Sequence, residues 1–133
     1  MRTFFALLVL LAAAVSLVWS QKKAPQPKPA AIQVVTVNAQ RDGDLLAIDG
    51  QLKNAGERPA ANLVIIVDVL NADKQAITTQ KSKSEPATVD PGEDGEVHAQ
   101  MALPAKAVYI RLSFEDGSGR DLKSTNTGPF TIE

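Results

Sequence analysis

Residues 45–70 constrain the fold more than any other stretch, because apolar and polar side chains alternate there on both sides of a turn-forming centre. In the first half Leu46, Ile48 and Leu52 share one face, and residues 63–70 are the most hydrophobic run outside the N-terminal segment. A period of two residues is that of a β-strand with one buried face. We therefore expect a buried β-hairpin here, with Gly50 at a bulge or at a close contact with the facing sheet.

The same alternation recurs along most of the chain, in short runs separated by Gly, Pro, Asn and Asp, and no stripe with a helical period interrupts it. We predict an all-β fold, an antiparallel β-sandwich of about seven strands, preceded by an N-terminal signal helix. The predicted strands are 32–39, 45–54, 63–70, 75–81, 96–103, 107–115 and a weaker last strand ending at 131–132.

The strand at 75–81 has one strong apolar residue and is expected at a sheet edge, where Lys81 and Lys83 discourage pairing with another chain. Residues 82–95 have the composition of a long surface connection. Gly43 is expected to take the positive φ of a tight turn, and residues 116–119 are expected to form a hairpin turn.

Residues 1–20 have the three parts of a secretory signal peptide: a positive charge at Arg2, an apolar run, and small or β-branched residues at Val18 and Ser20. Cleavage is predicted after Ser20. The alternative is an uncleaved membrane anchor at 4–19, although its sixteen residues are fewer than the eighteen or so of a spanning helix. Because no cysteine follows the apolar run, a bacterial lipoprotein anchor is excluded.

Residues 21–31 follow as a linker, with three prolines, three lysines and no side chain expected in a core. Proline disfavours helix in the residue before it, so we expect an extended, semi-rigid tether. A proline-rich ligand for another protein is the alternative. Residues 32–133 are then expected to form one β-sandwich domain.

Charge and composition exclude several classes of protein. From residue 30 onward ten basic residues face fifteen acidic ones, a formal charge of about −5, which disfavours a nucleic-acid partner. The chain has no cysteine, so it holds no disulfide, no thiolate metal site and no nucleophilic thiol.

The pattern G-x-x-x-N-x-G appears at 50–56 as GQLKNAG, followed by LVIIVDVLNADKQAI at 63–77 and by an acidic turn at 90–93. Together these segments resemble bacterial extracytoplasmic FxLYD-type domains and the related CARDB sandwiches. The resemblance covers about 45–114 and is one of fold, since VDVLN at 67–71 replaces the name-giving motif. It implies an immunoglobulin-like, usually non-catalytic domain with an interaction or structural role.

His98, on the polar face of its predicted strand, is the one imidazole that a catalytic centre could use. A triad would need a serine such as Ser82, Ser84 or Ser118, and none of them lies in the G-x-S-x-G elbow of a hydrolase. We therefore expect no enzyme activity and no cofactor, with His98 as a solvent-facing strand residue.

Asp90, Glu93, Asp94 and Glu96 are weak candidates for a metal site, because calcium takes about six to eight oxygen ligands and tolerates loop geometry. Their spacing departs from that of a calcium loop at its third residue. A solvated turn is favoured, and a small-ligand or calcium-binding sandwich using residues 90–96 is the alternative function.

Tyr109, Arg111, His98 and Gln100 occupy outward positions and are a candidate protein-interaction face, since tyrosine and arginine are enriched at interfaces. The sequence thus predicts a periplasmic or secreted protein that binds or spaces other bacterial envelope components without catalysis. A protein partner is expected, of unknown identity. The membrane is a partner only if residues 4–19 are retained, as in a membrane-anchored, extracytoplasmic accessory subunit.

Overall fold

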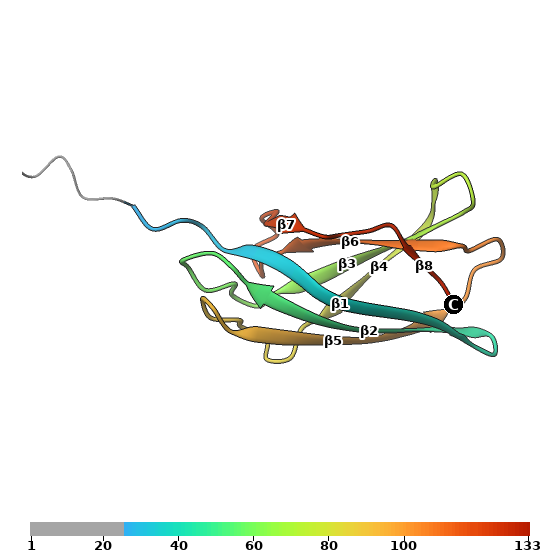
Figure 1. Cartoon of the computed structure of the whole chain (residues 1–133), viewed down its shortest axis with the longest axis horizontal. Coiled ribbons are helices and arrows are strands. Elements are labelled where there is room, and N and C mark those ends of the chain that lie inside the picture. The colour runs from blue at the N-terminus through green and yellow to red at the C-terminus, as the bar shows by residue number, and fades with distance from the viewer. Residues whose placement is uncertain (1–25) are drawn as a thin grey trace, which may run out of the picture.

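The computed structural model describes residues 26–133, which form two four-stranded β-sheets packed face to face (Figure 1). The strand order is β5-β2-β1-β7 in one sheet, called the β1 sheet, and β4-β3-β6-β8 in the other, called the β3 sheet. The strands are β1 (Ala31–Asp42), β2 (Leu45–Asn54), β3 (Val64–Leu70), β4 (Ala76–Lys83), β5 (Asp94–Ala102), β6 (Tyr109–Glu115), β7 (Lys123–Thr125) and β8 (Phe130–Thr131). The predicted all-β, sandwich-like fold is confirmed, whereas the predicted signal helix lies outside the described residues.

The predicted hairpin of residues 45–70 is wrong, because β2 and β3 lie in different sheets. β2 pairs with β1 and β5, and β3 pairs with β4 and β6, all antiparallel. The connection between β2 and β3 therefore crosses from one sheet to the other. Alternation shows that each strand buries one face, but it does not show which strand lies beside it.

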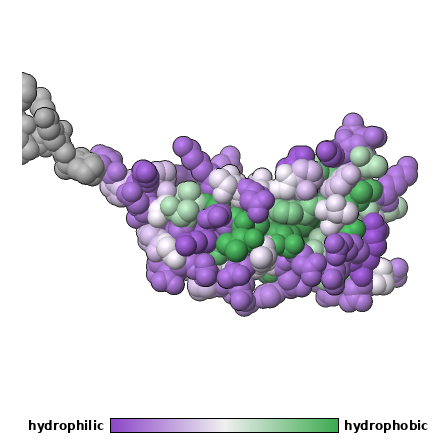
Figure 2. Space-filling model, viewed as in Figure 1, coloured by the Kyte–Doolittle hydropathy of each residue, from purple (hydrophilic) through white to green (hydrophobic). Residues whose placement is uncertain are grey.

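The apolar faces of the two sheets meet between them. Within the described residues, the buried cluster runs from Ala30 to Ile132. Figure 2 shows apolar side chains gathered along the middle of the molecule between polar margins. The largest fully buried side chains include Phe114, Ile32, Leu46, Ile48, Leu52, Leu63, Ile65, Leu70, Ile110 and Leu112.

The edge strand β4 was predicted correctly from the sequence, whereas the C-terminal strands were predicted only in part. β4 lies at the edge of the β3 sheet, as expected, and is exposed along almost its whole length. The last residues form two strands where one was expected: β7 pairs in parallel with β1, and β8 pairs with β6 in the other sheet. Strands of three and two residues are too short for alternation to reveal them.

The two glycines singled out in the sequence behave differently. Gly43 has a φ of +61° in the β1–β2 turn, as predicted. The bulge expected at Gly50 lies instead in the neighbouring strand, where the register shifts between Val34 and Thr36. A Cβ on Gly50 would lie 3.0 Å from a Val97 side-chain carbon and 3.2 Å from the Thr36 carbonyl oxygen, so the close contact is within its own sheet.

The sandwich has two ends that matter for the site. The chain enters at one of them, called the tether end, which also carries the turns at 55–63, 84–93 and 116–122 (Figure 1). β1 runs from there to the far end, where the turns at 43–44, 71–75 and 103–108 lie with Glu133. The twelve residues of β1 span roughly 40 Å at about 3.3 Å per residue.

The boundary of the domain lies earlier than the sequence suggested. β1 begins at Ala31, and Ala30 is buried, so the end of the predicted linker belongs to the sandwich. Among residues 26–133, no helix has the length and apolar character to span a membrane. The signal peptide or anchor predicted at 1–20 lies outside the described residues.

Candidate functional site

The incoming chain is held against the turn that follows β2. The amide of Ala55 donates to the Ala31 carbonyl at 2.8 Å, and the amide of Glu57 donates to the Lys28 carbonyl at 3.2 Å. The Glu57 carboxylate in turn accepts from the Lys28 amide at 3.0 Å. We call residues 28–31 and 54–57 the tether clamp, because they fix the path by which the chain enters the sandwich.

Gly56 allows the two parts of the tether clamp to approach each other. A Cβ at this position would overlap the Pro29 carbonyl oxygen and would lie 2.8 Å from both Ala30 Cα and the Ala31 nitrogen. These are backbone atoms, which cannot rotate away as a side chain can. Glycine is therefore required here by the close approach of another chain segment.

Asn54 is the central side chain of the tether clamp and is fully buried. Its Nδ2 donates to the carbonyl oxygens of Arg58 and Val89, at 2.8 and 2.9 Å. Its Oδ1 accepts from the amides of Gly56 and Ala31, at 3.0 and 3.4 Å. Both donors and both acceptor sites of the amide are thus used, which is the condition for burying it without penalty.

The position of Asn54 in its strand carries a signal for this role. Asn54 lies two positions after Leu52 and so continues the inward phase of β2 into the core. An asparagine at an inward position must find partners on other segments. A polar residue in the buried phase at the end of a strand therefore indicates a structural hydrogen-bond centre.

His98 lies between two carboxylates on the outer face of the β1 sheet. Its Nδ1 is 2.7 Å from Asp49 Oδ1, and its Nε2 is 3.2 Å from Glu96 Oε2. These residues line an open depression of about 260 Å³ together with Asn38 and Gln51 among others. All three charged side chains are more than half exposed, so water screens their interactions strongly.

The pKa of His98 is raised above its usual 6.5, first by the hydrogen bond to Asp49 and then by that to Glu96. A raised pKa means that any stabilisation is fully present below pH 6.5 and is lost as the pH rises through the folded-state pKa. We expect an NMR titration of the His98 ring to give a pKa above 6.5, and D49N to lower it more than E96Q. A wild-type pKa at or below 6.5 would contradict this geometry.

The four residues predicted to form one interaction face do not lie together. His98 and Gln100 are on β5, in the β1 sheet, whereas Tyr109 and Arg111 are on β6, in the β3 sheet. They therefore point to opposite outer faces of the sandwich. Lys74 lies over the Tyr109 ring, 6.0 Å from its centroid, at the far end. Alternation shows which side chains of a strand point outward, but it does not show to which of the two sheets the strand belongs.

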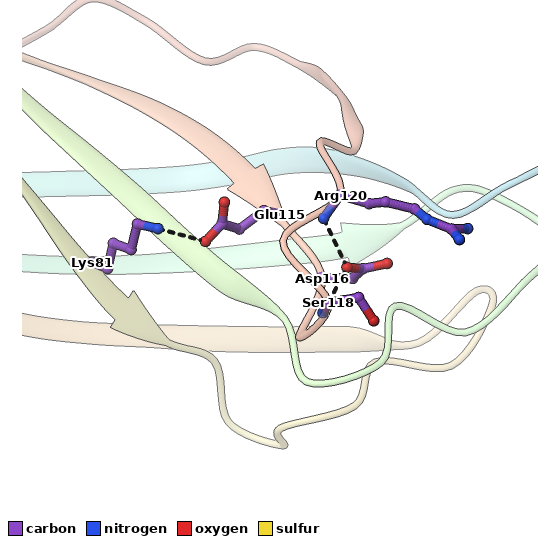
Figure 3. Close-up of polar contacts among 5 residues, drawn as sticks. All are labelled: Lys81, Glu115, Asp116, Ser118 and Arg120. Carbon is purple, nitrogen blue, oxygen red and sulfur yellow. Dashed lines mark hydrogen bonds and ion pairs between the residues drawn. The ribbon is translucent and has the colours of Figure 1, made fainter.

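The outer face of the β3 sheet carries an ion pair across three strands. Lys81 on β4 reaches over β3, and its Nζ lies 2.8 Å from Glu115 Oε1 on β6 (Figure 3). Beside it, Asp116 Oδ1 accepts from the amides of Ser118 and Arg120 at 2.9 and 3.0 Å, which stabilises the predicted turn (Figure 3). Lys81 is exposed but Glu115 is largely buried, so water screens the Lys81–Glu115 ion pair from one side only, and it contributes on the order of 1 kcal/mol to stability.

The serines considered for a triad have other surroundings. Ser84 is buried, and its hydroxyl donates to the Pro86 carbonyl at 2.8 Å. Ser82 lies on β4, in the other sheet from His98, and Ser118 lies in the 116–119 turn at the tether end. Within residues 26–133 the hydrogen-bond partners of His98 are the two carboxylates, and no serine is among them.

The four acidic residues of the predicted weak metal site lie at or near the start of β5. The backbone amide of Glu93 donates to the Asp90 carbonyl at 3.0 Å. The side-chain Nε2 of Gln51 donates to Asp94 Oδ2 at 3.5 Å, and Glu96 faces His98. In the part of the chain that the structure describes, no group of three or more His, Asp or Glu is arranged to hold a metal ion.

Comparison with known proteins finds low similarity to solved structures. No protein-family model matches the sequence, and no curated protein matches it. IrmA from Escherichia coli is 12% identical with a TM-score of 0.45, over 81% of this chain and 99% of IrmA. β-Glucosidase 3B from Thermotoga neapolitana, in complex with α-D-glucose, is 16% identical with a TM-score of 0.45, over 77% of this chain but 16% of the enzyme. Similarity at this level assigns neither a family nor a function.

Proposed function

We propose that the protein is an exported, non-catalytic β-sandwich module that binds or spaces other components of the bacterial envelope. The observation that carries this proposal is the tether clamp. Residues 28–31, at the end of the proline-rich stretch, are pinned to the sandwich by Ala55 and Glu57, so the path by which the chain enters the domain is fixed. A spacer or a docking module needs such a fixed path, whereas a freely jointed linker would not supply it.

The distance between the two ends of the sandwich supports the same proposal. The tether joins at one end, and three turns with Glu133 lie at the other, roughly 40 Å away by the length of β1. Two outer sheet faces of polar character lie along this length. A module held in this way presents its far end and its faces to other envelope components.

Export is tested by labelling a single cysteine in cells. The chain has no cysteine of its own, so Ala72→Cys, at an exposed position of a far-end turn, gives one reactive thiol. We expect a membrane-impermeant maleimide to label this variant, expressed in cells from the whole gene, after the outer membrane alone is permeabilised. Labelling that requires lysis of the inner membrane would overturn the proposal.

The fate of residues 1–20 is a separate question within the proposed function. A mature N-terminus at Gln21, found by mass spectrometry, would establish cleavage as predicted. Full-length protein in the membrane fraction would instead establish the anchored form. Both forms expose the sandwich outside the cytoplasm, so this measurement separates the two forms without testing export itself.

The binding part of the proposal is tested by photo-crosslinking in cells. A photoreactive residue at Gln100 reports on the β1 sheet, and one at Arg111 reports on the β3 sheet. We expect protein adducts from one face and few from the other, because an interface occupies one surface patch. If no adducts form from either face or from a photoreactive residue at position 72, binding is rejected and the spacing role alone is left.

The calcium-binding alternative rests on the carboxylates of residues 90–96. Isothermal titration of calcium into the protein is expected to give no heat, and calcium is expected to leave the melting temperature unchanged. A rise in melting temperature that D94N and E96Q abolish would favour the alternative instead.

A further inference from the structure

We infer that the sandwich is built to bear tension, because a pull that arrives through the N-terminal tether loads β1 in shear along its axis. This inference rests on the proposed spacing function for its biological use. The mechanical behaviour itself follows from the topology. How the load is shared among hydrogen bonds depends on three features: the tether, the direction of β1, and the strands on the two sides of β1.

β1 is held on both of its sides. On one side it pairs with β2 along almost its whole length, from Ile32 opposite Asn54 to Asp42 opposite Leu45. On the other side it pairs in parallel with β7, from residues 31–33. This second contact continues beyond β7, because Asn126 donates from Nδ2 to the Val34 carbonyl at 2.9 Å.

The C-terminal segment also holds β1 at the far end. The amide of Arg41 donates to the Glu133 carbonyl at 2.8 Å, and the amide of Glu133 donates to the Ala39 carbonyl at 2.9 Å. Residues 123–133 therefore run in the same direction as β1, from the tether end to the far end, and are bonded to it near both of its ends (Figure 1). Between these contacts, β8 pairs with β6 in the other sheet.

These directions determine how the hydrogen bonds fail. When the tether is pulled against the far end, β1 must slide past β2, β7 and the C-terminal segment, and the bonds on both sides are strained together. When the tether is pulled against another point of the tether end, β1 peels away one pair at a time. A load shared over many bonds requires a higher force at the same loading rate, since forced unfolding follows the barrier that must be crossed.

The tether clamp delivers the load to β1. Asn54 and Gly56 hold residues 28–31 against the end of β2, so a pull on the tether reaches a strand that is already paired. Without the clamp, residues 28–31 would detach first and extend the linker at low force. The clamp and the pairing of β1 thus form one path for tension.

Single-molecule force spectroscopy on the full chain tests the inference. One handle is attached at the N-terminus and the other either at residue 133, for shear, or at Ser118→Cys in the tether-end turn, for peeling. We expect the mean unfolding force in the first geometry to be roughly twice that in the second or more. Equal forces in the two geometries would overturn the inference.

A matched pair of substitutions tests the contribution of the C-terminal segment. Asn126→Asp removes the donor to Val34 while keeping the size of the side chain, and we expect it to lower the force in the shear geometry alone. Asn71→Asp is the control, because Asn71 uses Oδ1 as an acceptor for the amides of Asp73 and Gln75, which aspartate retains. An equal loss of force in both geometries for N126D, or no loss in either, would contradict the proposed role.

The outcome is separable from that of the proposed function. Failure of the maleimide labelling in cells would remove export and leave the ratio of the two forces unchanged. Equal forces in the two pulling geometries would remove the shear mechanism and leave export and binding open.

Discussion

Replacing Asn54 by alanine is expected to lower the free energy of unfolding by roughly 2–4 kcal/mol. The substitution removes the side-chain partner of the Gly56 and Ala31 amides and of the Arg58 carbonyl, in a place where water does not reach the side chain. It also removes one of the two donors to the Val89 carbonyl, which keeps the amide of Ala60. Urea denaturation measures the effect as a lower midpoint with an unchanged slope.

Asn71→Ala is the control for this experiment. Asn71 also bonds two backbone amides, those of Asp73 and Gln75, but in an exposed turn where water replaces a lost partner. Its expected cost is about 1 kcal/mol or less. A stability of N54A within about 1 kcal/mol of the wild type would show that the buried amide is not the centre of the clamp.

Gly56→Ala is expected to destabilise the protein by roughly 2 kcal/mol or more, because the added methyl group overlaps backbone atoms of residues 29–31. The chain must then move away from the turn, and the bonds between Lys28 and Glu57 and between Ala31 and Ala55 are lost or lengthened. The loss is measured by thermal and urea unfolding.

The matched control is Gly43→Ala, where an added Cβ meets no atom within 4 Å. Its cost is limited to placing alanine at a φ of +61°, about 1 kcal/mol. If G56A is no more destabilising than G43A, residues 28–31 do not lie where the structure places them.

The sequence predicted most of the strands well because β1, β2, β3, β5 and β6 each bury one face. Two of the predicted segments form strands with a buried face: the alternating residues Leu46, Ile48 and Leu52, and the run at 63–70. The turn at Gly43 follows from the ability of glycine to adopt a positive φ. These are local properties, since the period and the turn chemistry are written in adjacent residues.

The same reasoning could not predict which strands belong to the same sheet. In a sandwich both sheets bury an alternating face, so β2 and β3 look like a hairpin even though they lie in opposite layers. The same ambiguity placed His98 and Tyr109 on one face. Only contacts between distant segments decide such questions, and alternation carries no record of them.

The candidate site was missed for a different reason. Asn54 and Gly56 lie in the turn-forming centre of residues 45–70, and turns are where these residue types most often occur. Their role depends on residues 28–31 and on Val89, which are far away in the chain. The linker, assigned from its prolines and lysines, gave no sign that its last residues dock on the sandwich.

Amide hydrogen exchange at the tether clamp tests the account most directly. The amides of Ala55 and Glu57 donate to residues 31 and 28, so both should exchange far more slowly than in an unstructured peptide. G56A should speed their exchange, whereas G43A should not. Exchange of both wild-type amides at the rate of an unstructured chain would show that the tether is not fixed to the sandwich, and would contradict the account.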